Sequence, residues 1–290
     1  DKTYTIMKTI LTFINEPNDS KEFIQNVARM ATKLDANIHL LYVQNPEKYA
    51  YTTSAAAGTT VTRINQDLEK LAESTEKIFD QYISDLREKI PENVFIDYST
   101  ELGVPSVIIN EYISAKKADM LVVEGQRDEN FWTQTLSNIE IIRNVECPVW
   151  VFPASWTFKP YQEIIYATDY KEEDIKGLTK LIKITQVFSP VITALHVTDS
   201  VDFEQKVKKA GFLEMLKEKI GYDNLKVKML NEKDDDIVTK LNDYANHINA
   251  NLIVLLRENK SFFERLFTKD QTKKIVKKTN MPLLVFHSEK

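Results

Sequence analysis

The stretch VVEGQRDENFWTQTLSNIEIIRNVECPVWVFP, residues 122–153, decides which fold the sequence predicts. An apolar run ends at Gly125, a polar segment and a helix follow, and a second apolar run begins after Pro148. Strand, helix and strand in this order are typical of a βαβ unit, whose two strands run parallel. The turn after such a strand is where α/β proteins bind phosphate groups, and its glycines bring backbone amides close to the ligand. This turn has only one glycine.

The bulk composition is that of an ordinary globular protein. The chain has 290 residues, of which 43% are hydrophobic and 28% charged, and its net charge is -5. This length allows two domains of about 145 residues each. With no apolar run long enough to span a bilayer and no signal-peptide pattern, we expect a cytoplasmic protein without a membrane partner. The negative charge, with acids between the lysines, argues against nucleic acid as a partner.

The chain repeats itself. MKTILTFINEPND, which begins at Met7, aligns with YQEIIYATDYKEED, which begins at Tyr161. ADMLVVEG, residues 118–125, aligns with ANLIVLLR, residues 250–257, and CPVWVFP aligns with MPLLVFH near the end of the chain. Because repeats of this length each make one structural unit, we predict two domains, residues 1–155 and 156–290.

Each copy alternates strands and helices, as α/β proteins with parallel sheets do. Residues 120–123 are apolar throughout, which is typical of a strand covered by helices on both faces. The predicted fold class is α/β, with two tandem flavodoxin-like or Rossmann-like α/β/α sandwiches of five parallel strands each. Helical periodicity predicts an amphipathic helix over 64–90, a helix that begins at Pro105 and buries Val107, and an earlier helix capped by Asp19 with Glu22.

The order and spacing of the segments ILTFIN, HLLYV, ELGVP, ADMLVVEG and CPV resembles the universal stress protein family. The whole chain is similar to a tandem member, with the match over residues 7–153 and 161–287. Members of that family pair their last strands antiparallel across a two-fold axis. The resemblance therefore implies that VWVF and LLVF pair in this way and make an internal pseudo-dimer. Such apolar strands could not remain open sheet edges without inviting aggregation.

The resemblance also implies where a nucleotide would bind in the first repeat. Family members that bind ATP have an aspartate after the first strand, which contacts the adenine, and a loop G-x2-G-x9-G-[S/T] after the fourth. Here the aspartate position falls on Asn15, and the first two glycine positions fall on Gly125 and Asp128. The third glycine position falls on Asn138 when counted forward from Gly125, or on Thr135 when counted back from Cys147. Neither register restores the motif.

The second repeat departs from the motif differently. Asp169 matches the adenine-contacting aspartate, but Arg257 occupies the place of the first glycine, and the loop that follows has none. The resemblance leaves open that Arg257 and Lys260 hold a phosphate with their side chains. The ends of the second strands, Val43 and Val197, complete the two candidate clefts.

Both clefts are interpreted as degenerate nucleotide sites, because side chains replace the glycines that allow backbone amides to approach phosphate. The carboxylate of Asp128 would repel a triphosphate by about 1 kcal/mol per close charge pair in water, and by roughly 4 kcal/mol at an intermediate dielectric. A magnesium ion held by Asp128 is the alternative. We therefore predict no cofactor, with ATP as the disfavoured alternative.

No residue is predicted to be catalytic or to bind a metal. The four histidines have no metal-ligand spacing, and neither a nucleophile elbow nor a Walker sequence is present. His196, beside the second cleft, is interpreted as a structural histidine. The one cysteine, Cys147, excludes an intrachain disulfide and is expected to pack rather than to react.

Three functions follow from the resemblance. The first is a tandem universal stress protein that is not an enzyme and acts in stress response through protein contacts or weak ligand sensing. The alternatives are an ATP- or AMP-binding stress regulator that uses one retained cleft, and an enzyme of the adenine-nucleotide hydrolase type. The expected partners are the other repeat of the same chain and an unidentified protein, and a homodimer is left open.

Overall fold

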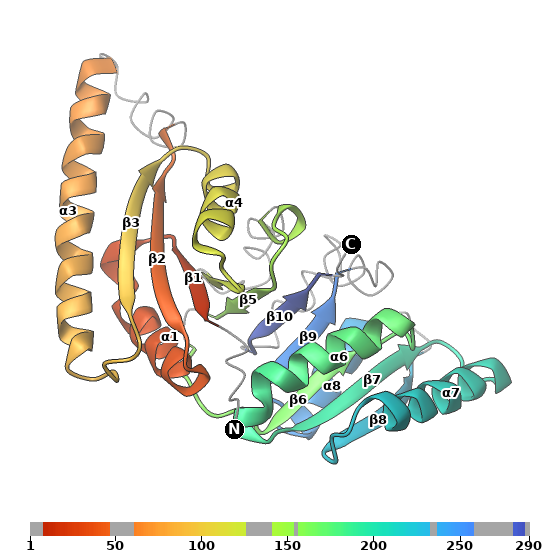
Figure 1. The fold of residues 1–290 in the computed structure, drawn as a ribbon. Coiled ribbons are helices and arrows are strands. Elements are labelled where there is room, and N and C mark those ends of the chain that lie inside the picture. The colour runs from red at the N-terminus through yellow and green to blue at the C-terminus, as the bar shows by residue number, and fades with distance from the viewer. Residues whose placement is uncertain are drawn as a thin grey trace. The chain divides into compact units, whose positions relative to one another are not determined.

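The computed structural model describes residues 8–46, 61–125, 141–153, 156–232, 237–257 and 281–287 (Figure 1). Its contacts divide the chain into two compact units. The first consists of Asp1–Glu124 with Asn144–Cys147, and the second of Gly125–Arg143 with Pro148–Lys290. The domain boundary predicted between residues 155 and 156 was based on the sequence repeat. These contacts do not test it, so it stays a prediction.

The first unit contains four parallel strands in the order β3-β2-β1-β4. The strands are β1 (Thr9–Ile14), β2 (Asn37–Gln44), β3 (Ile96–Leu102) and β4 (Met120–Glu124). The helices are α1 (Lys21–Leu34), α3 (Val61–Arg87) and α4 (Pro105–Lys116). α1 and α3 lie on one face of these strands and α4 lies on the other (Figure 1). β1 and β4 are nearly completely buried because helices cover both faces.

The second unit repeats this order as β8-β7-β6-β9, and β10 follows β9. Its parallel strands are β6 (Glu163–Ala167), β7 (Val191–Thr198), β8 (Leu225–Asn231), β9 (Leu252–Leu256) and β10 (Leu283–Phe286). Its helices are α6 (Glu172–Thr185), α7 (Phe203–Lys219) and α8 (Ile237–His247). The prediction of a tandem α/β fold with parallel sheets is confirmed.

The last strand of the first repeat, β5 (Val149–Phe152), pairs antiparallel with β10. Trp150 faces Leu284 in this register, and every side chain of both strands is fully buried. Trp150 also stacks on Tyr161, with ring centroids 5.3 Å apart. The antiparallel pairing predicted for the two last strands is confirmed, and it gives each apolar strand a hydrogen-bonded neighbour.

Two expectations about helices were wrong in detail. Asp19 does not cap α1, because it belongs to a 3-10 helix, Pro17–Asp19, and the residue before α1 is Ser20. α4 begins at Pro105 as predicted, yet Val107 on its first turn is 54% exposed. Local spacing identified these helices, but their ends and buried faces depend on the neighbouring elements.

A buried histidine connects β2 to β3 and α4. His39 is 2% exposed, its Nδ1 lies 2.5 Å from Asp97 Oδ1, and its ring stacks on Tyr112 at 5.3 Å between centroids. Asp97 also contacts Lys116 Nζ at 3.2 Å, and the Tyr112 hydroxyl donates to Glu101. Burial lowers the pKa of His39 below its usual 6.5, against the opposing effect of the Asp97 carboxylate.

This shift predicts acid-sensitive stability. Between the lowered pKa and 6.5 the unfolded chain binds more protons at His39 than the folded chain, so the free energy of unfolding falls as the pH falls through that window. We expect the melting temperature to fall more between pH 7 and pH 5 in the wild type than in His39→Gln. Differential scanning fluorimetry of both proteins across this range measures it, and equal slopes would contradict the prediction.

Candidate functional site

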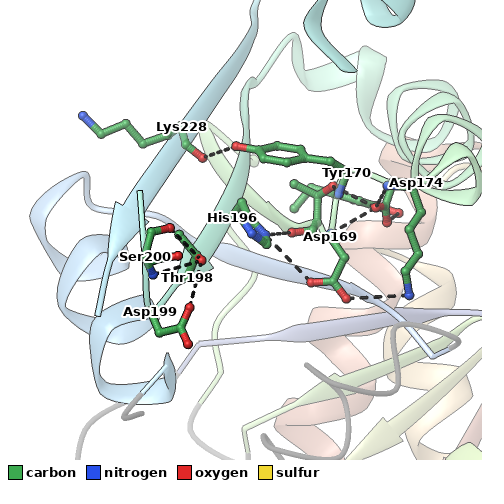
Figure 2. A network of polar contacts seen from close by, with 11 residues as sticks. Asp169, Tyr170, Asp174, His196, Thr198, Asp199, Ser200 and Lys228 are labelled. Carbon is green, nitrogen blue, oxygen red and sulfur yellow. Dashed lines mark hydrogen bonds and ion pairs between the residues drawn. The ribbon is translucent and has the colours of Figure 1, made fainter. Parts of the chain in front are cut away.

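One buried carboxylate organises the turn after β6 (Figure 2). Asp174, on the first turn of α6, is fully buried. Its Oδ2 accepts hydrogen bonds from the Thr168 hydroxyl at 2.8 Å and from the backbone amides of Asp169 and Lys171, both at 3.1 Å. The Tyr166 hydroxyl donates to Oδ1 at 3.2 Å. A carboxylate that accepts this many bonds at a helix start is strongly stabilised, and it holds the backbone of Asp169 in place.

Asp169 is the residue that the resemblance assigns to adenine contact. Its side chain is 18% exposed, and its carboxylate oxygens lie 3.8 Å from His196 Nδ1 and 3.9 Å from Lys171 Nζ (Figure 2). Both distances exceed a normal hydrogen bond, so these are loose electrostatic contacts. Asp169 therefore presents a partly exposed acceptor at the carboxyl end of β6.

His196, on β7, is held by backbone and ring contacts. Its Nδ1 lies 2.7 Å from the carbonyl oxygen of Thr168, and because a carbonyl only accepts, Nδ1 donates. The ring packs on Tyr170 at 4.6 Å, and Tyr170 packs on Phe212 at 5.2 Å. The imidazole is 9% exposed, and its Nε2 has no hydrogen-bond partner among the described residues. The ring therefore forms part of the wall of the second cleft.

Tyr170 has a left-handed backbone, with φ at 59°, which is uncommon for a residue with a side chain. Its amide donates to the Thr168 hydroxyl at 2.9 Å, and its own hydroxyl donates to the Lys228 carbonyl at 3.4 Å. Burial raises the pKa of Tyr170 well above its usual value of 10. The phenol is therefore neutral at physiological pH, and it packs the turn after β6 against β8, the strand beyond β7.

Arg257 occupies the place of the first phosphate-loop glycine. Its amide donates to the Phe286 carbonyl at 2.9 Å, and its guanidinium donates to the Arg143 carbonyl at 3.0 Å. Val197, at the end of β7, is 5% exposed and belongs to the core. Lys260 lies outside the described residues. At the position where a phosphate-binding loop has a glycine, this chain therefore has a side chain, and its guanidinium donates to a carbonyl of the protein.

In the first repeat, the residues predicted to form the nucleotide cleft bond to different parts of the protein. Asn15 donates through Nδ2 to the Glu124 carbonyl at 3.1 Å, and the Gly125 amide donates to the Phe152 carbonyl at 2.7 Å. Val43, at the end of β2, is 6% exposed. Asp128 and Asn138, together with Thr135 of the alternative register, lie outside the described residues.

Sequence reasoning missed Glu124, the last residue of β4. It is 7% exposed, and its Oε2 lies 2.9 Å from the Ser20 hydroxyl in a buried contact. The Ser20 hydroxyl also lies 2.9 Å from the Glu16 carbonyl. The available signal was one acid at the end of an otherwise apolar strand, at a position where the second repeat has Leu256. A buried carboxyl group therefore directly precedes the Gly125 turn.

The family profile of the universal stress proteins matches residues 7–153 and 160–287. The chain belongs to the universal stress protein family. Its two matched segments correspond to the two repeats, so the tandem arrangement is confirmed. No curated protein sequence matches the chain.

Solved structures of similar fold cover nearly the whole of this universal stress protein. One from Archaeoglobus fulgidus, itself a universal stress protein, is 14% identical, with a TM-score of 0.64 and 96% of each chain covered. A protein of unknown function from Pseudomonas aeruginosa is 15% identical, with a TM-score of 0.59 over 99% of this chain and 95% of that one. The cytoplasmic domain of a prokaryotic cation chloride cotransporter is 13% identical, with a TM-score of 0.50 over 96% and 95%. At these identities the likeness establishes the fold.

In the residues that the structure describes, no three His, Cys, Asp or Glu side chains come together as metal ligands would. None of the helices described there has the length and apolar character needed to cross a bilayer. Burial raises the pKa of the Cys147 thiol to about 12, so this side chain is a poor nucleophile at neutral pH.

The Asp174 network predicts a large loss of stability on truncation. Asp174→Ala leaves buried donors without an acceptor, so we expect the free energy of unfolding to fall by about 3 kcal/mol. Glu173→Ala is the matched control, because Glu173 is the preceding residue and is exposed, and it should change stability by less than about 0.5 kcal/mol. Urea denaturation followed by circular dichroism compares the two, and equal midpoints would contradict the assignment.

Proposed function

We propose that this universal stress protein is a cytoplasmic regulator without enzymatic activity, which acts in stress response through protein contacts or weak ligand sensing. Neither strand-end cleft holds ATP in this proposal. The observation that carries it is Arg257, in the repeat that retains the adenine-type aspartate. Its side chain stands at the first glycine position and its guanidinium is bonded to a carbonyl of the same protein, 3.0 Å away.

The electrostatics of the first repeat support the same proposal. Glu124 buries a carboxyl group at the strand end that precedes the phosphate turn, and Asn15 replaces the adenine-contacting aspartate. A carboxylate near a phosphate raises the free energy of the bound state, by roughly 4 kcal/mol per close pair at an intermediate dielectric. The two repeats thus disfavour a triphosphate for different reasons, one through charge and the other through a side chain in the loop.

A nucleotide-binding regulator is the second candidate, and Asp169 favours it. Its carboxylate is partly exposed at the carboxyl end of β6 and lies 3.8 Å from His196 Nδ1 and 3.9 Å from Lys171 Nζ. In a cleft of this kind it could accept a hydrogen bond from an exocyclic amine. This candidate requires that the second cleft bind AMP or ATP without a glycine cradle.

Two measurements separate the candidates. The purified protein is denatured and the released small molecules are chromatographed, and its melting temperature is then measured with millimolar ATP and magnesium at constant ionic strength. We expect no stoichiometric nucleotide and no shift in the melting temperature. The test is sensitive, because a ligand at a hundred times its Kd would stabilise the native state by about 2.7 kcal/mol.

Matched variants show which candidate holds. An upward shift in the wild type that disappears in Asp169→Ala but persists in Asp223→Ala would overturn the proposal in favour of nucleotide binding at the second cleft. Asp223 is a suitable control because it is an exposed carboxylate in the turn before β8. It takes no part in the contacts of Asp169 with Lys171 and His196.

A further inference from the structure

Helix α7 has apolar side chains on the face that points away from the sheet. The helix lies alongside β8 (Figure 1), and its inward face buries Phe212 and Leu216. On the opposite face, Phe203 is 82% exposed and Val207 is 53% exposed. Four residues separate these two side chains, so they are neighbours one turn apart on the helix surface. Adjacent exposed apolar groups of this size are typical of a contact surface.

The equivalent helix of the first repeat has no such face. α3, like α7, connects the second and third strands of its repeat. Over residues 65–87, the part of α3 whose side chains the structure describes, every exposed residue is polar or charged. The fold therefore does not require apolar residues on the outward face of this helix. A contact with another molecule would account for those of α7.

A glycine belongs to the same face. Gly211 lies four residues after Val207 inside α7, and it is exposed. A Cβ there would meet no heavy atom of the described residues within 4 Å, so packing within that part of the chain does not require glycine. After proline, glycine is the residue that least favours a helix. Its presence is explained if a bulky group of another molecule packs against the backbone at this point.

These positions are symmetric about Val207. Phe203 is four residues before it and Gly211 is four residues after it, so each lies about 6 Å from Val207 along the helix axis. A two-fold axis beside Val207 would place the Phe203 ring of one copy over Gly211 of a second copy, and the reverse. Such an interface uses the same surface on both molecules, and a large side chain opposite a glycine lets two helices approach closely.

The charges beside this face also fit a second copy of the chain. On one flank, Glu204 and Lys208 form an exposed ion pair of 2.6 Å. They lie three residues before and one residue after Val207, so the two-fold axis brings each Glu204 near Lys208 of the other copy. Lys206, on the other flank, has no ion pair with the described residues and would face Lys206 of the second copy, which lowers the affinity. Charge this nearly balanced does not favour an acidic segment or an anionic membrane.

We propose that two copies of this protein associate through α7, with Phe203 of each copy packed on Gly211 of the other around a two-fold axis at Val207. An aromatic side chain buries about 150–250 Å², so the two Phe203 rings supply at most roughly 500 Å² of the 1,200 Å² or more that specific interfaces usually bury. The dimer is therefore weak and forms only at high concentration. This contact uses neither strand-end cleft, so it stands independently of the proposed function.

Sedimentation velocity of the full chain over a concentration series measures the association. We expect the weight-average sedimentation coefficient of the wild type to rise between about 5 μM and about 500 μM, as it does for a weak interface. Phe203→Glu should abolish this rise, whereas Phe95→Glu should leave it unchanged. Phe95 is the matched control, because it is also a phenylalanine on the surface, 70% exposed, and it lies in the first repeat. No rise in the wild type, or an equal rise in Phe203→Glu, would overturn the proposal.

Gly211→Leu tests the contact without changing Phe203. Because an added Cβ meets no described atom, the melting temperature of this variant should not fall. Its dimer should be at least about tenfold weaker, because the leucine side chain occupies the place of the Phe203 ring. Undiminished association of a folded Gly211→Leu protein would show that the two helices do not pack in this way.

Co-sedimentation with vesicles of phosphatidylserine and phosphatidylcholine examines the other occupant of an apolar helix face. We expect the wild type and Phe203→Glu to remain in the supernatant equally. Vesicle binding that Phe203→Glu abolishes, in a protein that does not associate with itself, would assign the face to a lipid surface and so refute the dimer.

Discussion

The antiparallel pairing of β5 with β10 is the constraint on which the sheet of the second unit depends. Both strands are completely apolar and completely buried, so neither could end a sheet in water without exposing both its side chains and its backbone groups. Pairing satisfies the backbone of each with the other, and Trp150 adds ring contacts with Phe152 and Tyr161. A tandem chain supplies both strands from one polypeptide, so this pairing requires no second molecule.

The two repeats have the same order of strands but different residue types at equivalent positions. The strand before the phosphate turn ends in Glu124 and Gly125 in the first repeat, and in Leu256 and Arg257 in the second. One repeat has a buried carboxyl group in contact with Ser20 there, and the other has a guanidinium that donates to a carbonyl. Backbone packing is retained in both, because these changes alter only the chemistry at the ends of the strands.

In the second repeat, polar contacts fix the turn at the end of β6. Asp174 binds the backbone of the turn, Tyr170 adopts a left-handed conformation there, and His196 is bonded to the turn carbonyl. Such a network stabilises one conformation of the loop whether or not a ligand is bound. Helix α6, which provides Asp174, also carries Lys176 and Lys180, which line a pocket together with Leu256 and Phe286 at the ends of β9 and β10.

The sequence by itself determined the repeat, the alternation of strands and helices, the family and the positions of the strands, because apolar periodicity and strand-helix order are local properties of the chain. The loss of the glycine pattern was also readable, since it is a matter of residue identity. Only the tertiary structure decided that Glu124 is buried against Ser20, 104 residues away, and that Arg257 reaches the carbonyl of Arg143. It also decided the start of α1 and the exposure of Val107, because these depend on which distant elements pack together, and no periodicity records such contacts.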